Sequence, residues 1–113
     1  MKSLYLSGPI RNMENNNREA FEFYAALLRE QGFRVFNPLE KESQTEAEPN
    51  DEKFLRKMFF DDCKFICLES DVVALMPGWK RSRGCRAEKA LAQAIGIPIL
   101  FLEHREGGVQ KSE

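Results

Sequence analysis

An acidic residue stands on a helix face that is expected to be apolar. Hydrophobic periodicity predicts a helix from Arg83 to Gly96, and Glu88 falls on its inward face together with Leu91 and Ile95. Glu88 is also close to the helix N-terminus, where the partial positive charge of the helix favours an ionised carboxylate. Gly84, one turn earlier on the same face, leaves room for a ligand to approach the end of the helix.

A second helix, predicted from about Asp51 to Leu68, repeats this anomaly. Asp62 lies about 180° around the helix from Lys53, which marks the solvent face. The neighbours of Asp62 on that arc are apolar: Leu55, Met58, Phe59 and Ile66. Asp61 falls toward the margin of the arc and is expected to be an ordinary surface acid.

Two inward-facing acids are the minimum equipment for breaking a glycosidic bond. One carboxylate attacks or stabilises the anomeric carbon, and the other handles the proton of the leaving group. The alternative for Glu88 and Asp62 is that each is a buried structural acid, satisfied by backbone amides or by an arginine. The helical pattern alone leaves both interpretations open.

Cations concentrate where the helix that carries Glu88 begins. Five of them fall within ten residues: Lys80, Arg81, Arg83, Arg86 and Lys89. The cluster is either a solvated turn or part of an anion site, in which Ser82, Gly84 and free backbone N–H groups seat a phosphate and Arg11 approaches from another loop. Trp79 either stacks on a base or pins this loop.

The elements that must position these residues alternate along the chain. The predicted strands are Leu4–Ser7, Phe33–Phe36, Asp71–Met76 and Pro98–Leu102, and the third predicted helix is Asn17–Gln31. This order predicts an α/β fold: one three-layer, flavodoxin- or Rossmann-like domain over residues 1–103 with a parallel sheet of about four strands, then a flexible tail over 104–113. Ligands bind such sheets beyond the carboxyl ends of the strands, here just after Ser7, Asn37 and Met76.

Composition excludes several classes of function. The chain has 113 residues and a net charge of -1, which argues against a protein that binds nucleic acid through many phosphates. Its apolar runs are too short for a membrane span, so we expect a cytoplasmic protein with no membrane partner. The three cysteines lack metal-site spacing, and no Walker or G-x-G-x-x-G motif occurs, so we expect no metal and no cofactor.

Five motifs together resemble a known superfamily. They are Tyr5-Leu6-Ser7-Gly8-Pro9-Ile10-Arg11, Asn17-x-x-Ala20-Phe21, Val35-Phe36-Asn37-Pro38, Asp62-Cys63-x-x-Ile66-Cys67-x-x-x-Asp71 and Pro77-Gly78-Trp79-x-x-Ser82-x-Gly84-x-x-x-Glu88. The chain is similar over nearly its whole length to the nucleoside 2-deoxyribosyltransferase-like superfamily, and most similar to a small phage and bacterial group within it. The relatives include 2'-deoxynucleoside 5'-phosphate N-hydrolases.

The resemblance implies roles for individual residues. It makes Glu88 the nucleophile on the sugar C1′ and Asp62 the residue that assists proton transfer to the departing base. It also implies a substrate-binding set of Tyr5, Gly8, Pro9, Ile10, Arg11, Asn37, Trp79, Ser82 and Gly84, of which Gly8, Ile10, Arg11, Ser82 and Gly84 bind the 5′-phosphate. Pro9 stands where the N-hydrolases have a serine, and this removes one hydroxyl and one N–H donor.

These expectations combine into one predicted function. The chain is expected to be an N-glycosidase that cleaves the base–sugar bond of a (deoxy)nucleoside 5′-monophosphate; the alternatives are a nucleoside 2-deoxyribosyltransferase, a hydrolase of NAD-like compounds or a non-catalytic nucleotide-binding module. The acid-rich segment Leu39–Asn50 is predicted to be a mobile loop that covers the base. The resemblance, and the phenylalanines of the predicted helix 51–68, indicate a homodimer or larger homo-oligomer.

Overall fold

The computed structural model describes residues 1–42, 51–104 and 109–111. The strands are β1 (Ser3–Ser7), β2 (Arg34–Phe36), β3 (Val72–Leu75), β4 (Ile99–Leu102) and β5 (Val109–Lys111). The helices are α1 (Arg18–Glu30), α2 (Pro38–Glu42), α3 (Glu52–Leu68) and α4 (Arg83–Ala94), with short 3-10 turns η1 (Glu14–Asn17) and η2 (Trp79–Arg81). The predicted α/β fold is confirmed.

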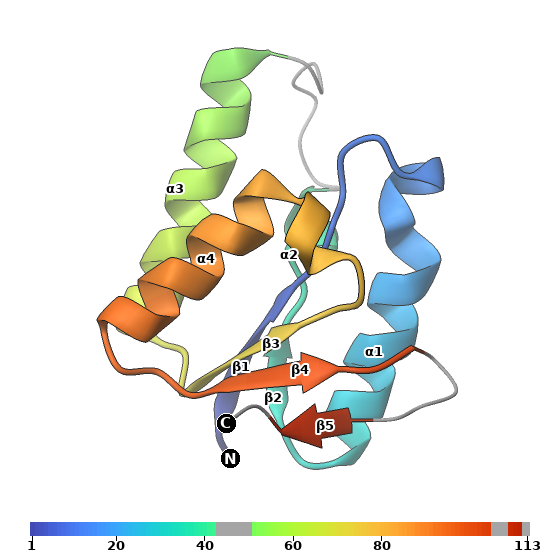
Figure 1. Ribbon diagram of the computed structural model, residues 1–113, viewed down its shortest axis with the longest axis vertical. Helices are drawn as coiled ribbons and strands as arrows, with labels where there is room; N and C mark the ends of the chain where they lie inside the picture. The colour runs from blue at the N-terminus through green and yellow to red at the C-terminus, as the bar shows by residue number, and fades with distance from the viewer. Residues whose placement is uncertain (43–50, 105–108, 112–113) are drawn as a thin grey trace.

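The sheet has the order β2-β1-β3-β4-β5 (Figure 1). The first four strands are parallel, and β5 pairs antiparallel with the edge strand β4. The sequence predicted no element after Leu102, so β5 corrects the expected tail at residues 109–111. Three residues are too few to show a hydrophobic pattern in the sequence. Strand β5 instead depends on its pairing with β4, which the sequence does not reveal.

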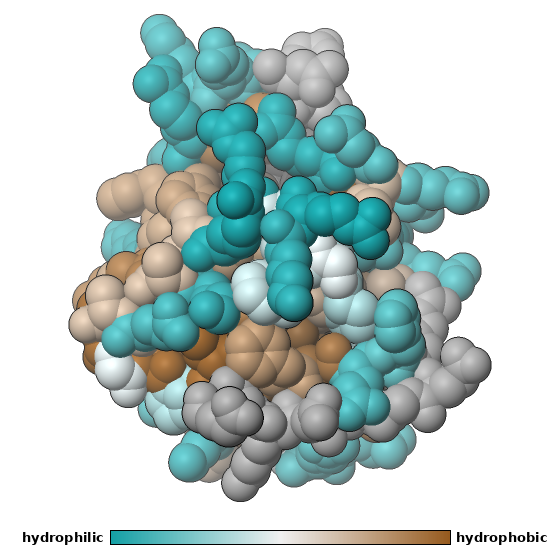
Figure 2. Space-filling model, viewed as in Figure 1, coloured by the Kyte–Doolittle hydropathy of each residue, from teal (hydrophilic) through white to brown (hydrophobic). Residues whose placement is uncertain are grey.

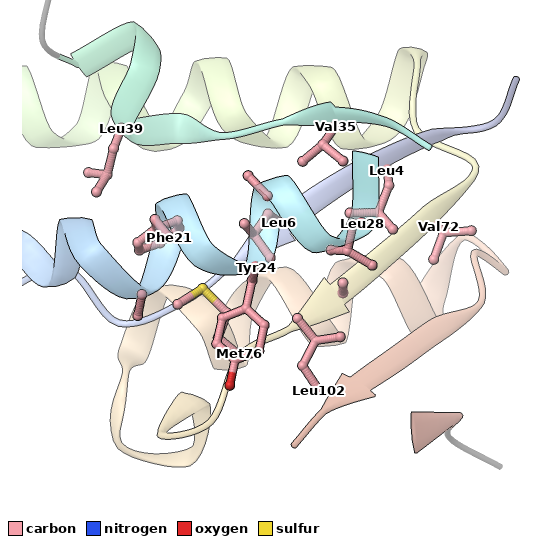
Figure 3. Packing of buried hydrophobic residues seen from close by; sticks show 13 residues of the cluster. Leu4, Leu6, Phe21, Tyr24, Leu28, Val35, Leu39, Val72, Met76 and Leu102 are labelled. Atoms are coloured by element: carbon pink, nitrogen blue, oxygen red, sulfur yellow. The ribbon is translucent and has the colours of Figure 1, made fainter. Parts of the chain in front are cut away.

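Successive side chains of β1 point alternately to the two faces of the sheet, and each face is covered by its own hydrophobic cluster. Leu4 and Leu6 point to the α1 face and belong to the larger hydrophobic cluster (Figure 3), whereas Tyr5 belongs to the cluster under α3 and α4. Figure 1 shows α1 on one side of the sheet and the α3–α4 pair on the other. Residues 5 and 7 of β1 therefore face helices α3 and α4, which carry Asp62 and Glu88.

Helix α1 forms because its apolar side chains recur on one face. Phe21, Tyr24 and Leu28 are almost fully buried against the sheet, and Figure 3 shows them beside Leu4 and Leu6. The helix gives way to β2 through a glycine at position 32, whose φ of +100° is a conformation that favours this residue type.

Capping fixes where α3 and α4 begin. The Asp51 side chain accepts a hydrogen bond from the Lys53 amide at 2.9 Å, as predicted for the start of α3. The Ser82 hydroxyl accepts one from the Cys85 amide at 3.2 Å and starts α4. The prediction of an inward Ile95 is wrong: α4 ends at Ala94, and the side chain of Ile95 is 45% exposed.

The predicted mobile loop Leu39–Asn50 requires a correction at its beginning. Helix α2 runs from Pro38 to Glu42, and residues 43–50 lie outside the described part of the chain. Asn37 caps this short helix, since its Oδ1 accepts a hydrogen bond from the Leu39 amide at 3.0 Å. The loop interpretation missed the helix because five residues are too few to show helical periodicity.

Candidate active site

Glu88 lies at the point where the sheet order reverses. From β1 the chain proceeds to β2 on one side, and β3 pairs with the other side of β1, so the carboxyl ends of β1 and β3 form the switch point at which α/β sheets bind ligands. Ser7 ends β1 and lies in register with Leu75 of β3. Helix α4 follows β3 through η2 and brings Glu88 back over this edge.

Both carboxylate oxygens of Glu88 accept hydrogen bonds from β1. The Tyr5 hydroxyl donates to Oε2 at 2.9 Å, and the Ser7 hydroxyl donates to Oε1 at 2.6 Å. The Glu88 side chain is 6% exposed, so these contacts replace most of its hydration. The prediction that Glu88 faces inward is confirmed.

The surroundings of Glu88 raise the pKa of its carboxyl group to about 7. Burial is the main cause, the hydrogen bond from Ser7 acts in the opposite direction, and the nearby charge of Asp62 adds to the increase. The hydrogen bond from Tyr5 also favours the ionised form. Glu88 therefore changes its charge near neutral pH, in the range where a carboxyl group can serve as nucleophile or acid.

Asp62 comes to the same centre from α3. It is buried, at 9% exposed, and its charge acts on both Glu88 and Tyr5. Burial and the two acids raise the pKa of the Tyr5 phenol well above its usual value, so Tyr5 remains a hydrogen-bond donor. Asp61 instead forms an ion pair with Lys57 at 2.9 Å; its side chain is 18% exposed, so it is a half-buried, paired acid and not the open surface acid that the helical pattern predicts.

The start of α4 presents an open surface beside this centre. A methyl group placed on the Gly84 Cα would meet no atom closer than the Ser82 hydroxyl oxygen, at 3.9 Å. Arg81 and Arg83 flank the same turn and are exposed, and so is Arg11 after β1. Backbone N–H groups, a hydroxyl and cations together have the chemistry of an anion seat.

The other predicted members of the turn after β1 are engaged in packing. A side chain at Gly8 would collide with Met76 and Phe21, so the glycine permits close packing of the loop on the core. Pro9 is buried and its carbonyl accepts a hydrogen bond from the Asn17 side chain at 3.0 Å, while Ile10 packs on the hydrophobic cluster. Arg11 is the member of this turn whose side chain reaches solvent.

Two further predicted binding residues have structural contacts of their own. The Asn37 side chain is buried and caps α2. Trp79 packs on Phe101 with ring centroids 5.5 Å apart, and the ammonium groups of Lys80 and Lys89 lie 5.9 and 5.4 Å from its ring centroid. These contacts favour the interpretation in which Trp79 pins the loop over stacking on a base.

Sequence reasoning missed Ser7 as a candidate site residue. Alternation along β1 places positions 5 and 7 on one face, so a hydroxyl at position 7 beside the phenol at position 5 was the available signal. Its importance depends on α4 crossing the end of β1, which hydrophobic patterns do not specify.

Three further features of the described residues concern metal binding, cysteine chemistry and membrane insertion. In that part of the chain no three histidine, cysteine, aspartate or glutamate side chains gather in a group that could hold a metal ion. Cys63, Cys67 and Cys85 are free thiols, and burial raises the pKa of Cys63 to about 11, which keeps it protonated at neutral pH. None of the described helices is long and apolar enough to cross a bilayer.

Comparison with known proteins places the fold. The sequence model of a family described as a domain of unknown function, DUF4406, matches residues 2–101. A solved structure of a 2-deoxyribosyltransferase from the psychrotolerant bacterium Bacillus psychrosaccharolyticus superposes with a TM-score of 0.70 at 22% identity, covering 88% of this chain and 71% of that one. No curated protein matches the sequence. The predicted resemblance to the nucleoside 2-deoxyribosyltransferase-like superfamily is thus confirmed at the level of the fold.

Proposed function

We propose that this chain, which belongs to the DUF4406 family, is an N-glycosidase that cleaves the base–sugar bond of a (deoxy)nucleoside 5′-monophosphate. The observation that carries the proposal is the state of Glu88: a buried carboxyl group, held at both oxygens, with a pKa of about 7 and a second acid beside it at the switch point of the sheet. A structural acid is usually satisfied by backbone amides or an arginine, whereas the described partners of Glu88 are two hydroxyl groups.

The proposed reaction takes two displacement steps. In the first, a carboxylate oxygen of Glu88 forms a bond to C1′ as the C1′–N bond breaks, and the electron pair of that bond stays on the base. Asp62 assists delivery of a proton to the leaving base. In the second, water attacks C1′ as the bond between C1′ and the Glu88 oxygen breaks; the hydroxyl group of the water stays on the sugar, its proton passes to Asp62, and the Glu88 carboxylate is regenerated.

The start of α4 supports the phosphate part of the proposal. Ser82 and Gly84 lie at the start of α4, about one turn before Glu88, and the exposed Arg11 is proposed to approach from the turn after β1. A phosphate bound there would orient C1′ toward the carboxylate. Gly8, Pro9 and Ile10 contribute by holding the turn from which Arg11 projects. Asn37 and Trp79 contribute indirectly: Asn37 caps α2, and Trp79 fixes η2 by packing on Phe101.

A second candidate reaction is transfer of the sugar to another base. It is favoured by the fold shared with the Bacillus 2-deoxyribosyltransferase, and it differs only in which nucleophile reaches the sugar bound to Glu88. A non-catalytic nucleotide-binding module is the third possibility: it retains the seat but releases no base.

One experiment separates these three functions. The wild-type protein and Glu88→Gln are incubated with ribo- and deoxynucleotides and the matching nucleosides, with and without an acceptor base, and the products are separated by chromatography. Free base from the wild type alone supports the glycosidase, and exchanged nucleosides support the transferase. A nucleotide-dependent rise in melting temperature without any product supports the binding module.

We further propose that the chain assembles at least as a homodimer through α3 and α4. Figure 2 shows hydrophobic side chains gathered over these helices, and an open groove of about 570 Å3 lies there, lined by Phe59, Phe60, Cys63, Cys67, Leu68 and Leu91 among others. Sedimentation of wild type and Phe60→Asp tests it: a dimer that the variant dissociates supports the proposal, and a wild-type monomer at high concentration contradicts it.

A further inference from the structure

Ser7 is a buried hydroxyl in a position that the backbone fixes firmly. It is 1% exposed and ends β1, where it pairs in register with Leu75. Its carbonyl accepts a hydrogen bond from the Met76 amide at 2.8 Å, so the strand is anchored to β3 at this residue. The backbone of Ser7 is therefore fixed relative to the sheet, and burial leaves its side chain little space to move.

The Ser7 hydroxyl makes the shorter of the two hydrogen bonds to Glu88. The distance from Oγ to Oε1 is 2.6 Å, within the range of bonds between a hydroxyl donor and an ionised acceptor. The Tyr5 hydroxyl holds Oε2 from the same face of β1. The two donors, two residues apart on a rigid strand, define the plane and direction of the carboxylate.

The groups around Glu88 make this donor necessary. Tyr5 faces it from β1, Asp62 and Cys63 face it from α3, and Cys85 faces it from its own helix. Each of these groups is neutral or negative, so none offsets a negative charge on Glu88 through a positive one. Among the side chains around Glu88, the hydroxyl donors Ser7 and Tyr5 are therefore the ones that favour its ionised form.

We propose that Ser7 is a positioning residue for the reaction: its hydroxyl holds Oε1 of Glu88 and so keeps the carboxyl group ionised and directed at C1′. This inference deepens the proposed function and rests on it for its catalytic part. The hydrogen bond and its effect on ionisation concern the protein alone and are measurable without substrate.

The rival explanation is that the Ser7 hydroxyl only fills space beside Glu88 and does not stabilise its ionised form. In that case its loss would weaken folding without changing how Glu88 titrates. Ser3 offers a matched control, because it is a buried serine on the same strand whose hydroxyl accepts a hydrogen bond from Arg34 and makes no contact with Glu88.

The test titrates Glu88 directly. Carboxyl 13C resonances of glutamate-labelled wild type, Ser7→Ala and Ser3→Ala are followed from pH 4 to 10, and Glu88→Gln identifies the signal of Glu88. We expect the Glu88 midpoint to rise by about one to two pH units in Ser7→Ala, and to stay in place in Ser3→Ala. If Ser7→Ala does not fold, Ser7→Cys, which keeps a weaker donor, takes its place with a smaller rise expected.

The pH dependence of base release tests the catalytic part of the proposal. We expect kcat of Ser7→Ala to fall about tenfold or more below the raised midpoint and to recover toward the wild-type value at alkaline pH. An unchanged Glu88 midpoint overturns the proposal. If the wild type releases no base but the midpoint moves as expected, the glycosidase fails while the control of Glu88 ionisation by Ser7 stands.

Discussion

The Tyr5 hydroxyl donates a hydrogen bond of 2.9 Å to Oε2 of Glu88 and links the middle of β1 to α4. This bond joins residues 83 positions apart in the sequence, in a place where neither group reaches solvent freely. The bond favours the ionised form of Glu88, so it supports the state that the proposed nucleophile requires.

Tyr5→Phe removes this donor and keeps the ring, which packs on Phe36 at a centroid distance of 5.5 Å. A hydrogen bond to a charged group contributes about 1.5 to 3 kcal/mol, so we expect the pKa of Glu88 to rise and kcat to fall about 10- to 100-fold at pH 6. The measurement is kcat between pH 5 and 10. A loss of equal size at every pH would show that Tyr5 acts other than through the charge of Glu88.

Glu88→Gln should stabilise the protein at alkaline pH. The pKa of Glu88 is about 7 in the folded protein against 4.5 in the unfolded chain, so the native state binds the extra proton between these values. The free energy of unfolding is therefore higher below pH 4.5, and it falls by about 3 kcal/mol as the pH rises from 4.5 to 7. Glutamine does not ionise and escapes this loss.

Urea unfolding of both proteins at pH 5 and pH 8 measures this effect. We expect the free energy of unfolding of Glu88→Gln to exceed that of wild type by more at pH 8 than at pH 5. A difference between the proteins that does not vary with pH would contradict a raised pKa for Glu88.

Asp62→Asn and Asp61→Asn are a matched pair on α3. Both remove one charge from neighbouring positions, but Asp62 is buried and acts on Glu88, whereas Asp61 binds Lys57. We expect Asp62→Asn to slow base release by about 10²- to 10⁴-fold, the usual contribution of a positioned acid or base, and Asp61→Asn to leave kcat within about twofold.

Substrates with activated leaving groups sharpen this prediction. A nucleotide whose base leaves without protonation needs less help from Asp62, so the defect of Asp62→Asn should shrink on it. A defect of the same size on both substrates would assign Asp62 to another task.

Substitution of Gly8 by alanine should lower stability, whereas substitution of Gly84 by alanine should affect substrate binding. At Gly8 the new methyl group collides with Met76 and Phe21, and overpacking of this kind costs about 1 to 3 kcal/mol of stability. At Gly84 the new methyl group makes only an ordinary contact with the Ser82 hydroxyl oxygen, at 3.9 Å, so folding is retained while the methyl group covers the surface proposed for phosphate. We expect Gly84→Ala to raise KM for nucleotides more than for nucleosides, and equal effects on both would argue against the phosphate seat.

Much of the fold followed from local patterns. The caps and apolar stripes of α1 and α3 predicted their positions closely, because helices longer than ten residues carry several turns of periodicity. Helix α2 and strand β5 were not predicted, because each has five residues or fewer and is held by tertiary contacts. The start of α2 is capped by a hydrogen bond that Asn37 Oδ1 accepts from the Leu39 amide, a signal that is hard to recognise in a polar, acid-rich segment.

The centre of the site was predictable, and its surroundings were less so. Glu88 and Asp62 were identifiable because an acid on an apolar face conflicts with the helical pattern. Gly8 and Asn37 resemble binding residues in sequence but have packing and capping contacts in the structure. Ser7 was overlooked because a serine at the end of a strand is unremarkable until the helix that it contacts is in place.

The central claim is that Glu88 attacks the sugar, and trapping the covalent intermediate tests it most directly. The protein is incubated with a nucleoside 5′-monophosphate that carries fluorine at C2′, which slows release of the sugar from the enzyme, and is then digested for mass spectrometry. We predict base release and a glycosyl ester on the peptide that contains Glu88, absent from Glu88→Gln. Turnover of unmodified nucleotide by Glu88→Gln at the wild-type rate, or an adduct on another residue, would contradict the account.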